Sequence, residues 1–197
     1  MSVIRILDTL AWLAALVYST IPSFWLAIHP HVESWRSRRR SPYRVLVPMW
    51  IGMWVVAGAI TWPWRHVTLY SAPAAWIPAV ALFAAGFALY KNGGRNFSGA
   101  QLGGRPELEP GRHDQRLVTS GIRGRVRHPI YLAHLCELLG WSVGSGLAVG
   151  YALTAFAVIT GAVMIQHEDR ELEERFGEAY REYRRRVPAV LPKFVKN

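Results

Sequence analysis

The chain is poor in cysteine and in acidic residues, and each shortage excludes something. Cys136 is its single cysteine, so no intrachain disulfide can form, and its place in an apolar run indicates a packing role. The chain has 13 Asp and Glu against 23 Lys and Arg, which gives a formal net charge of +10. The charges lie in blocks between long uncharged segments. This pattern indicates a membrane protein with basic loops and no nucleic-acid partner.

Two kinds of motif are also missing. Residues 91–126 contain many glycines but no G-x-G-x-x-G fingerprint after a strand, which excludes a soluble-type Rossmann domain. The histidines do not follow the H-x-x-H, H-x-x-x-H or H-E-x-x-H spacings, so we expect no metal site. The first apolar segment is too long for a signal peptide and no A-x-A cleavage pattern follows it, so we expect it to span the membrane.

Long apolar segments dominate what is present. An α-helix rises ~1.5 Å per residue, so about 20 apolar residues cross the hydrocarbon core. The segments that qualify are residues 9–28, 45–62, 73–90 and 147–165. The shorter segment 130–142 is expected to form a helical hairpin with the last of them, and whether it crosses fully is left open. The predicted fold is an all-α integral membrane bundle of about five transmembrane helices.

The basic residues predict the orientation of this bundle. All but two of the 23 Lys and Arg lie in residues 33–44, 91–128 and 166–197. Five crossings bring these three blocks to one side, which the positive-inside rule makes the cytoplasm. The amino terminus is then outside and the carboxyl terminus cytoplasmic. We expect residues 1–197 to form a single membrane domain, with peripheral helices in 1–64 and a core in 73–194.

Two segments at the cytoplasmic side have their own character. Residues 91–126 form a Gly- and Pro-rich loop of a length that is usually functional or disordered. Residues 168–186 have an apolar stripe at helical spacing, which predicts an amphipathic helix packed on the bundle or on lipid headgroups.

Ionisable groups at membrane depth are candidates for function. Arg127 and His128 precede the hairpin, and Glu168 ends its second arm, so His128 and Glu168 are expected at one end of the bundle. A carboxylate there suits a cationic cofactor. His134 and Glu137 lie one turn apart. With Arg127, they are candidate substrate-binding residues, and the alternative for this pair is a polar contact that joins helices.

Several motifs together resemble a known family. Arg127-His128-Pro129-Ile130-Tyr131 resembles the R-H-P-x-Y motif of isoprenylcysteine carboxyl methyltransferases and related membrane phospholipid methyltransferases. Residues 117–121 resemble the L-V-x-x-G upstream of it, Glu168-Asp169 stands where the family has E-E, and residues 176–183 resemble its F-G-x-x-Y-x-x-Y. The resemblance covers roughly residues 90–194.

The resemblance implies an S-adenosylmethionine-dependent methyltransferase with a lipophilic or lipid substrate in the membrane. It implies that Glu168 holds the cofactor and that Gln101 is a further contact. The pocket would be lined by Gln115, Arg116, Leu117, Val118, His128, Pro129, Ile130 and Tyr131. Displacement of a methyl group needs alignment more than acid–base chemistry, so we assign no single catalytic residue.

The substrate half of the family pattern matches less well. Arg123 stands where the family usually has Tyr, and Met164 stands where the carboxyl methyltransferases tend to have an Arg that meets the substrate carboxylate. The acceptor therefore stays open between an isoprenoid acid, a phospholipid amine and a thiol. An NADPH-dependent membrane reductase of the sterol-reductase type, which shares an H-P-x-Y element, is the first alternative. A non-enzymatic lipid-binding protein with arginines on anionic lipids is the second.

Overall fold

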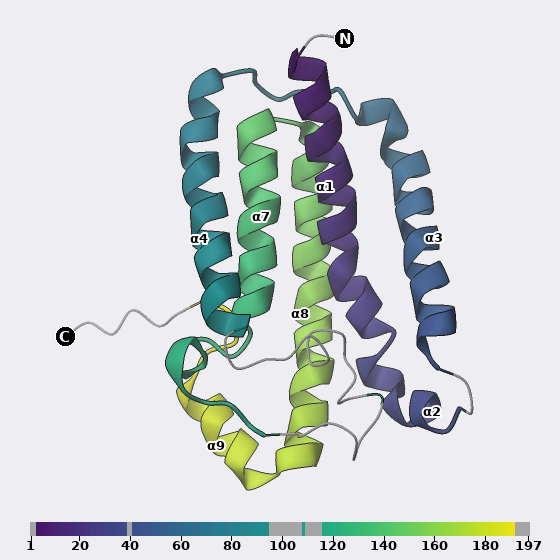
Figure 1. Cartoon of the computed structure of the whole chain (residues 1–197), viewed down its shortest axis with the longest axis vertical. Coiled ribbons are helices and arrows are strands. Elements are labelled where there is room, and N and C mark those ends of the chain that lie inside the picture. Colours follow the sequence, from purple (N-terminus) through teal and green to yellow (C-terminus); the bar gives the residue numbers. More distant parts are fainter. Residues whose placement is uncertain (1–2, 39–40, 95–107, 109–115, 192–197) are drawn as a thin grey trace, which may run out of the picture.

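The computed structural model describes residues 3–38, 41–94, 108 and 116–191, and these are almost entirely helical. Five long helices stand side by side in one bundle (Figure 1). They are α1 (Val3–Leu26), α3 (Tyr43–Thr61), α4 (Trp76–Gly94), α7 (Pro129–Ser145) and α8 (Ala148–Phe176). The predicted all-α membrane bundle is confirmed.

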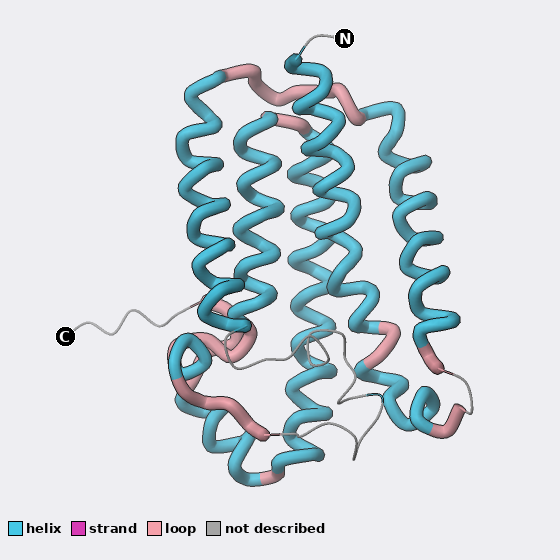
Figure 2. The backbone as a smooth tube through the Cα atoms, viewed as in Figure 1, coloured by secondary structure: helices cyan, strands magenta, loops and turns pink. Residues whose placement is uncertain are grey.

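Short elements connect and cap these helices (Figure 2). They are η1 (His29–His31), α2 (Val32–Arg36), η2 (Trp62–Trp64), η3 (Pro73–Ala75), η4 (Gly121–Gly124) and α9 (Glu178–Arg186). The part of the chain described contains no strand, only one isolated bridge between Thr68 and Leu147.

Four stretches are long and apolar enough to cross a membrane: Arg5–Arg36, Tyr43–Trp64, Pro73–Gly94 and Ala148–Phe176. Large apolar side chains on these helices face outward and are more than half exposed, which suits contact with lipid; examples are Val55, Ile60, Ile77, Phe87 and Ile159. The chain is therefore a multi-pass membrane protein. Helix α7 has 17 residues, about 26 Å, and runs along the bundle between α4 and α8 (Figure 1).

The chain connections fall at two opposite ends of the bundle (Figure 1). The start of α1, the α3–α4 connection and the α7–α8 turn share one end. The α1–α3 connection, the start of α7 and the charged end of α8 with α9 share the other. This arrangement collects the described parts of the three basic blocks at one end. Which side of the membrane that end occupies stays a prediction.

Helix α1 belongs to the core of the bundle. Its small and aromatic residues pack against α7 and α8 in one buried cluster, which contains Ala11, Trp12, Ala15, Leu16, Leu138, Leu147, Val149, Leu153 and Ala157. Helix α3 lies outside α1, and Trp50 and Trp54 both donate to Thr20 Oγ1 at 3.0 and 2.9 Å. Ala11 and Ala15 let α1 approach the hairpin, whereas α3 contacts the bundle through α1. The boundary between residues 64 and 73 stays a prediction.

Glycines let α4 and α7 approach each other closely. A Cβ atom on Gly140 would lie 2.6 Å from the Phe83 ring, and one on Gly144 would lie 2.6 Å from the Trp76 ring. Small residues at such interfaces are a common means of packing membrane helices. Gly146 ends α7 with φ of +68° and fits beneath the Tyr70 carbonyl, so the hairpin turn requires glycine for both conformation and space.

The carboxyl-terminal helix differs from the prediction. The expected single helix over 168–186 is broken at Gly177, whose φ of +59° ends α8 and lets α9 fold back. The apolar stripe is buried within the protein as a cluster of Tyr180, Tyr183 and Val187 packed with Leu117, Leu172 and Phe176. Only glycine adopts such a backbone readily, so the break follows from one residue inside an otherwise helical pattern.

Candidate functional site

The R-H-P-x-Y motif lies where α7 begins, beside the charged end of α8. His128 precedes the helix and Pro129 is its first residue, a position that suits a residue without a backbone N–H. The His128 ring is buried and contacts two carboxylates, with Nε2 3.2 Å from Asp169 Oδ1 and Nδ1 3.2 Å from Glu168 Oε2. One imidazole therefore faces two acidic residues that are adjacent in the sequence.

Asp169 is the centre of a structural network. It is 3% exposed, accepts a hydrogen bond from Arg127 Nη2 at 2.7 Å, and accepts another from the Tyr180 hydroxyl. Arg127 Nη1 also donates to the carbonyls of Arg184 and Val187. These contacts tie the start of α7 to α8 and α9. Arg127, predicted to bind substrate, thus has its guanidinium engaged by protein acceptors.

Backbone hydrogen bonds also hold the R-H-P-x-Y motif in place. The chain after α9 returns to it, and the amides of Arg127 and His128 donate to the carbonyls of Pro188 and Ala189 at 2.9 Å each. The Tyr183 hydroxyl donates to the Arg123 carbonyl at 2.7 Å. The position of His128 is therefore set by α9 and the segment after it.

Glu168 is held differently from Asp169. Its side chain is 20% exposed, and it accepts a hydrogen bond from the Tyr131 side chain. Its buried Oε2 atom forms an ion pair with His128 Nδ1 at 3.2 Å, but it receives no well-aligned hydrogen bond from the described residues. A buried carboxylate oxygen normally has such partners, so this one has capacity for a ligand that donates hydrogen bonds or carries positive charge.

The electrostatics of the cluster favour an imidazolium. Burial by itself lowers the pKa of His128, but the Glu168 and Asp169 carboxylates outweigh it and raise that pKa from 6.5 to about 9. Burial and the Asp169 carboxylate raise the pKa of Tyr180, which keeps its hydroxyl protonated as a donor. At neutral pH, one positive ring therefore holds the two carboxylates in place.

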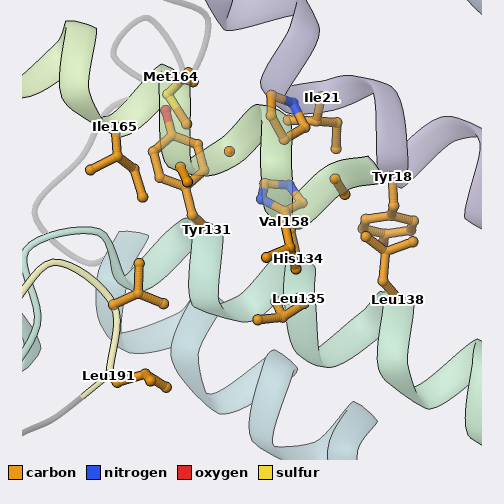
Figure 3. Close-up of a pocket in the computed structure, with 15 residues that line it drawn as sticks. Tyr18, Ile21, Tyr131, His134, Leu135, Leu138, Val158, Met164, Ile165 and Leu191 are labelled. Carbon is orange, nitrogen blue, oxygen red and sulfur yellow. The ribbon is translucent and has the colours of Figure 1, made fainter. Parts of the chain in front are cut away.

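An apolar cavity of about 270 Å³ adjoins this cluster between α1, α7 and α8 (Figure 3). Tyr131 joins the two regions, because its ring stacks on His128 with centroids 5.5 Å apart and also lines the cavity. Met164, which is fully buried, and Ile165 line the cavity from α8. The polar side chains in the lining are Tyr18, Tyr131 and His134. The arrangement places a cavity suited to an apolar molecule beside a carboxylate suited to a cation.

His134 and Glu137 face different neighbours. The His134 ring lies in the cavity wall among the rings of Tyr18, Tyr90 and Tyr131, at centroid distances of 5.7, 5.3 and 6.4 Å (Figure 3). Glu137 lies against α4, where a Cβ on Gly86 would be 2.7 Å from its Oε1. Neither a hydrogen bond nor an ion pair joins His134 to Glu137 in the described structure. His134 and Glu137 therefore make separate contacts with neighbouring helices, and their roles stay predictions.

The remaining predicted cofactor residues divide between several surroundings. Pro129 and Ile130 contact α4, where a Cβ on Gly93 would lie 3.3 and 3.0 Å from them. Leu117 packs on the Tyr180–Tyr183 cluster, Val118 is half-buried and Arg116 is exposed. Gln101 and Gln115 lie outside the described residues. The structure thus brings His128, Tyr131 and Glu168 together.

Sequence reasoning missed the residues that α1 and the following η1 segment contribute to the site. Tyr18 lines the cavity, and buried His29 forms an ion pair with Glu171 on α8. Polar residues within or next to a long apolar run are the signal that would have indicated them. Leu108, from the long loop, is buried with Ile28, Val32, Trp35 and Leu46, which places that part of the loop at the same end of the bundle. The described ranges contain no group of three His, Cys, Asp or Glu side chains fit to hold a metal ion.

Comparison with known proteins supports the resemblance over part of the chain. The chain is 37% identical over 87 residues to protein-S-isoprenylcysteine O-methyltransferase from Homo sapiens, covering 41% of this chain and 28% of that protein. It is 44% identical over 85 residues to the cobalt-zinc-cadmium resistance protein CzcN from Cupriavidus metallidurans, covering 42% and 38%. The resemblance to isoprenylcysteine methyltransferases is confirmed for about two fifths of the chain.

A reductase gives a match of similar strength. The chain is 34% identical over 93 residues to a Delta(14)-sterol reductase from Mus musculus, covering 45% of this chain and 22% of that protein. In each case the matched region is well under half of the relative. No family model matches the chain, and no solved structure matches it. The relatives support a membrane methyltransferase, with a reductase as the alternative.

Proposed function

We propose that the protein transfers a methyl group from S-adenosylmethionine to a lipophilic acceptor held within the membrane. The observation that carries the proposal is the position of Tyr131, which joins Glu168 to an apolar cavity. A methyltransferase that acts on a membrane acceptor needs these two sites in contact, one for a cationic cofactor and one for an apolar substrate. The partial match to isoprenylcysteine methyltransferases supports the same reading.

The residues present fit the cofactor. S-adenosylmethionine supplies an activated methyl group on a sulfonium and also carries an amino group, and both are cationic. The unused acceptor capacity at Glu168 Oε2 matches such a ligand. We assign Glu168, His128 and Tyr131 as its side-chain contacts. Further contacts are proposed from Gln101, Gln115, Arg116, Leu117, Val118, Pro129 and Ile130.

The protein's own residues hold the proposed cofactor-binding carboxylate in position and exclude water from the acceptor. His128 holds Glu168 in place, and the Arg127–Asp169 pair fixes His128 relative to α9. The apolar lining keeps water from the acceptor and orients it. Of the three residues predicted to bind substrate, we propose that His134 contacts the acceptor. Arg127 and Glu137 then act in packing, through Asp169 and α4 respectively.

Titration of S-adenosylmethionine by calorimetry into detergent-solubilised protein tests the proposal. Glu168→Gln removes the charge but keeps the shape, and we expect affinity to fall about tenfold or more. Glu174→Gln, which changes an exposed residue of the same helix, is the matched control and should bind like wild type. Folded wild-type protein that binds no S-adenosylmethionine would overturn the proposal.

The match to a Delta(14)-sterol reductase favours a second candidate, a nicotinamide-dependent membrane reductase. Thermal melting with each cofactor separates the two. Stabilisation by S-adenosylmethionine and not by NADPH is expected for the methyltransferase, because a ligand raises the melting temperature only of a state that binds it. The opposite result would establish the reductase instead.

A further inference from the structure

The lining of the cavity contains no formal charge. Among the described residues that form it there is no Lys, Arg, Asp or Glu, and the polar side chains are Tyr18, Tyr131 and His134. Three cations lie near the motif but not in this lining: Arg127 pairs with Asp169, His128 pairs with both carboxylates, and Arg123 donates to the Arg127 carbonyl. An acceptor held in this cavity therefore finds no opposite charge there.

This lining selects the charge state of the acceptor. A carboxylate or phosphate would lose its hydration without gaining a cation, and an ammonium group would lose it without gaining an anion. The lining therefore favours a reacting group that is uncharged at neutral pH, which disfavours carboxylic acids and amines because both are ionised there. An uncharged group with an acidic hydrogen becomes a strong nucleophile only when it loses that proton, so the cavity needs a base.

His134 has the surroundings of such a base. It lines the cavity one turn along α7 from Tyr131 (Figure 3). Tyr131 in turn donates to Glu168, the carboxylate proposed to hold the cofactor. The backbone carbonyl of Ile130 lies near the ring, and the Nδ1 atom of His134 is buried with no well-aligned hydrogen bond to the described residues. In a neutral imidazole that carries its proton on one ring nitrogen, the other nitrogen is a proton acceptor. The rings around it are those of Tyr18 from α1, Tyr90 from α4 and Tyr131 from α7, and α8 contributes apolar side chains to the cavity.

The acidity of the acceptor narrows the class further. A neutral imidazole removes a proton more readily from a thiol, whose pKa is about 8.5 in cysteine, than from a phenol, whose pKa is about 10 in tyrosine, and an alcohol is far too weak an acid. Building on the proposed function, we propose that the acceptor is a lipophilic thiol and that His134 accepts its proton. The S–H bond breaks, its electron pair stays on sulfur, and the proton passes to His134. The thiolate then bonds to the methyl carbon of S-adenosylmethionine, whose sulfur keeps the pair of the broken bond and leaves as a neutral thioether.

Binding without cofactor gives the first test. 1-Decanethiol, decanoic acid and decylamine share one chain and differ in the reacting group. We expect the thiol to bind to the protein at neutral pH, and the two charged probes to bind about tenfold more weakly or not at all. Tighter binding of the acid or the amine would overturn the inference.

Methyl transfer from labelled S-adenosylmethionine to the same three probes gives the second test. We expect transfer to the thiol, a loss of about 100-fold in His134→Gln at neutral pH, and recovery of that variant at high pH, where the thiol ionises by itself. Leu135→Ala, another cavity-lining change, should keep the wild-type pH profile. The rate of a variant that merely packs less well would not recover with pH.

The two proposals fail separately. Protein that binds S-adenosylmethionine but methylates the acid, the amine or none of the three overturns the thiol inference and leaves the methyltransferase standing. Protein that binds no S-adenosylmethionine overturns both. A His134→Gln variant with wild-type rate on the thiol overturns the role of His134.

Discussion

His29 Nδ1 lies 2.5 Å from Glu171 Oε2, so an ion pair joins two segments that are 142 residues apart in the chain. His29 is 7% exposed and stacks on Trp25, with ring centroids 5.3 Å apart. Glu171 follows Glu168 by one helical turn and also pairs with Arg175. The η1 segment that follows α1 is therefore held against α8 one turn from Glu168, the carboxylate proposed to hold the cofactor.

This relationship predicts that His29→Ala destabilises the protein by about 1–3 kcal/mol, because Glu171 loses a buried partner. The melting temperature should fall, and affinity for S-adenosylmethionine should fall with it. His31→Ala, an exposed histidine in the same turn, is the control. Equal effects from the two substitutions would contradict a specific role for the ion pair.

Glu168 and Asp169 are adjacent carboxylates, and we expect their substitutions to have opposite signatures. Asp169→Asn should cost about 3–5 kcal/mol, because Arg127 is left as a buried charge without its anion. Glu168→Gln should cost less than Asp169→Asn, because His128 keeps its contact with Asp169, and should mainly weaken cofactor binding. Chemical denaturation and calorimetry on both variants measure the two effects. A stable Asp169→Asn variant would show that the network does not hold α9 in place.

The raised pKa of His128 predicts how stability depends on pH. The folded protein holds this proton with a pKa of about 9 against 6.5 for an unperturbed histidine, so its stabilising contribution is complete below about pH 6.5. The contribution is lost as pH rises through about 9. Melting temperatures of wild type and His128→Asn should therefore differ most at low pH and converge above pH 9. A gap that widens with pH would contradict the imidazolium.

Substitutions at two glycines with positive φ distinguish the cost of backbone strain from the cost of steric crowding. Gly146→Ala must adopt φ of +68° and also press on the Tyr70 carbonyl, whereas Gly121→Ala has φ of +63° and nothing within 4 Å of its Cβ. We expect about 1–2 kcal/mol of destabilisation from strain at Gly121 and clearly more at Gly146. Thermal unfolding of both variants checks this. Equal losses would mean that the hairpin turn relaxes to admit the extra atom.

The predicted orientation can be tested with single cysteines in a Cys136→Ala background. Ser71→Cys and Glu182→Cys lie on exposed positions at opposite ends of the bundle. A membrane-impermeant maleimide should label residue 71 in intact cells and residue 182 only after permeabilisation, because the basic end is expected in the cytoplasm. The reverse pattern would invert the topology, and labelling of both in intact cells would contradict an odd number of crossings between them.

Much of the architecture could be predicted from the sequence for local physical reasons. Backbone groups in hydrocarbon must bond within a helix, so a run of about 20 uncharged residues determines a span by itself. The spans at residues 45–62 and 73–90 became α3 and α4, and the hairpin expected from 130–142 and 147–165 formed as α7 and α8. His128 and Glu168 could be placed at one end because a hairpin returns the chain to its starting level.

Tertiary packing decided what the sequence left open. Neighbouring residues on a helix point about 100° apart, so helical periodicity does not say which of Glu168 and Asp169 joins the buried network, and only the family resemblance favoured Glu168 as the cofactor residue. Helix α9 folds back at Gly177 and brings the Tyr180 hydroxyl to Asp169, which also accepts a hydrogen bond from Arg127. The cavity likewise exists only where α1 meets the hairpin, since Tyr18, His134 and Met164 come from three helices. The membrane spans follow from the preference of apolar segments for hydrocarbon, whereas the site depends on which helix faces pack together.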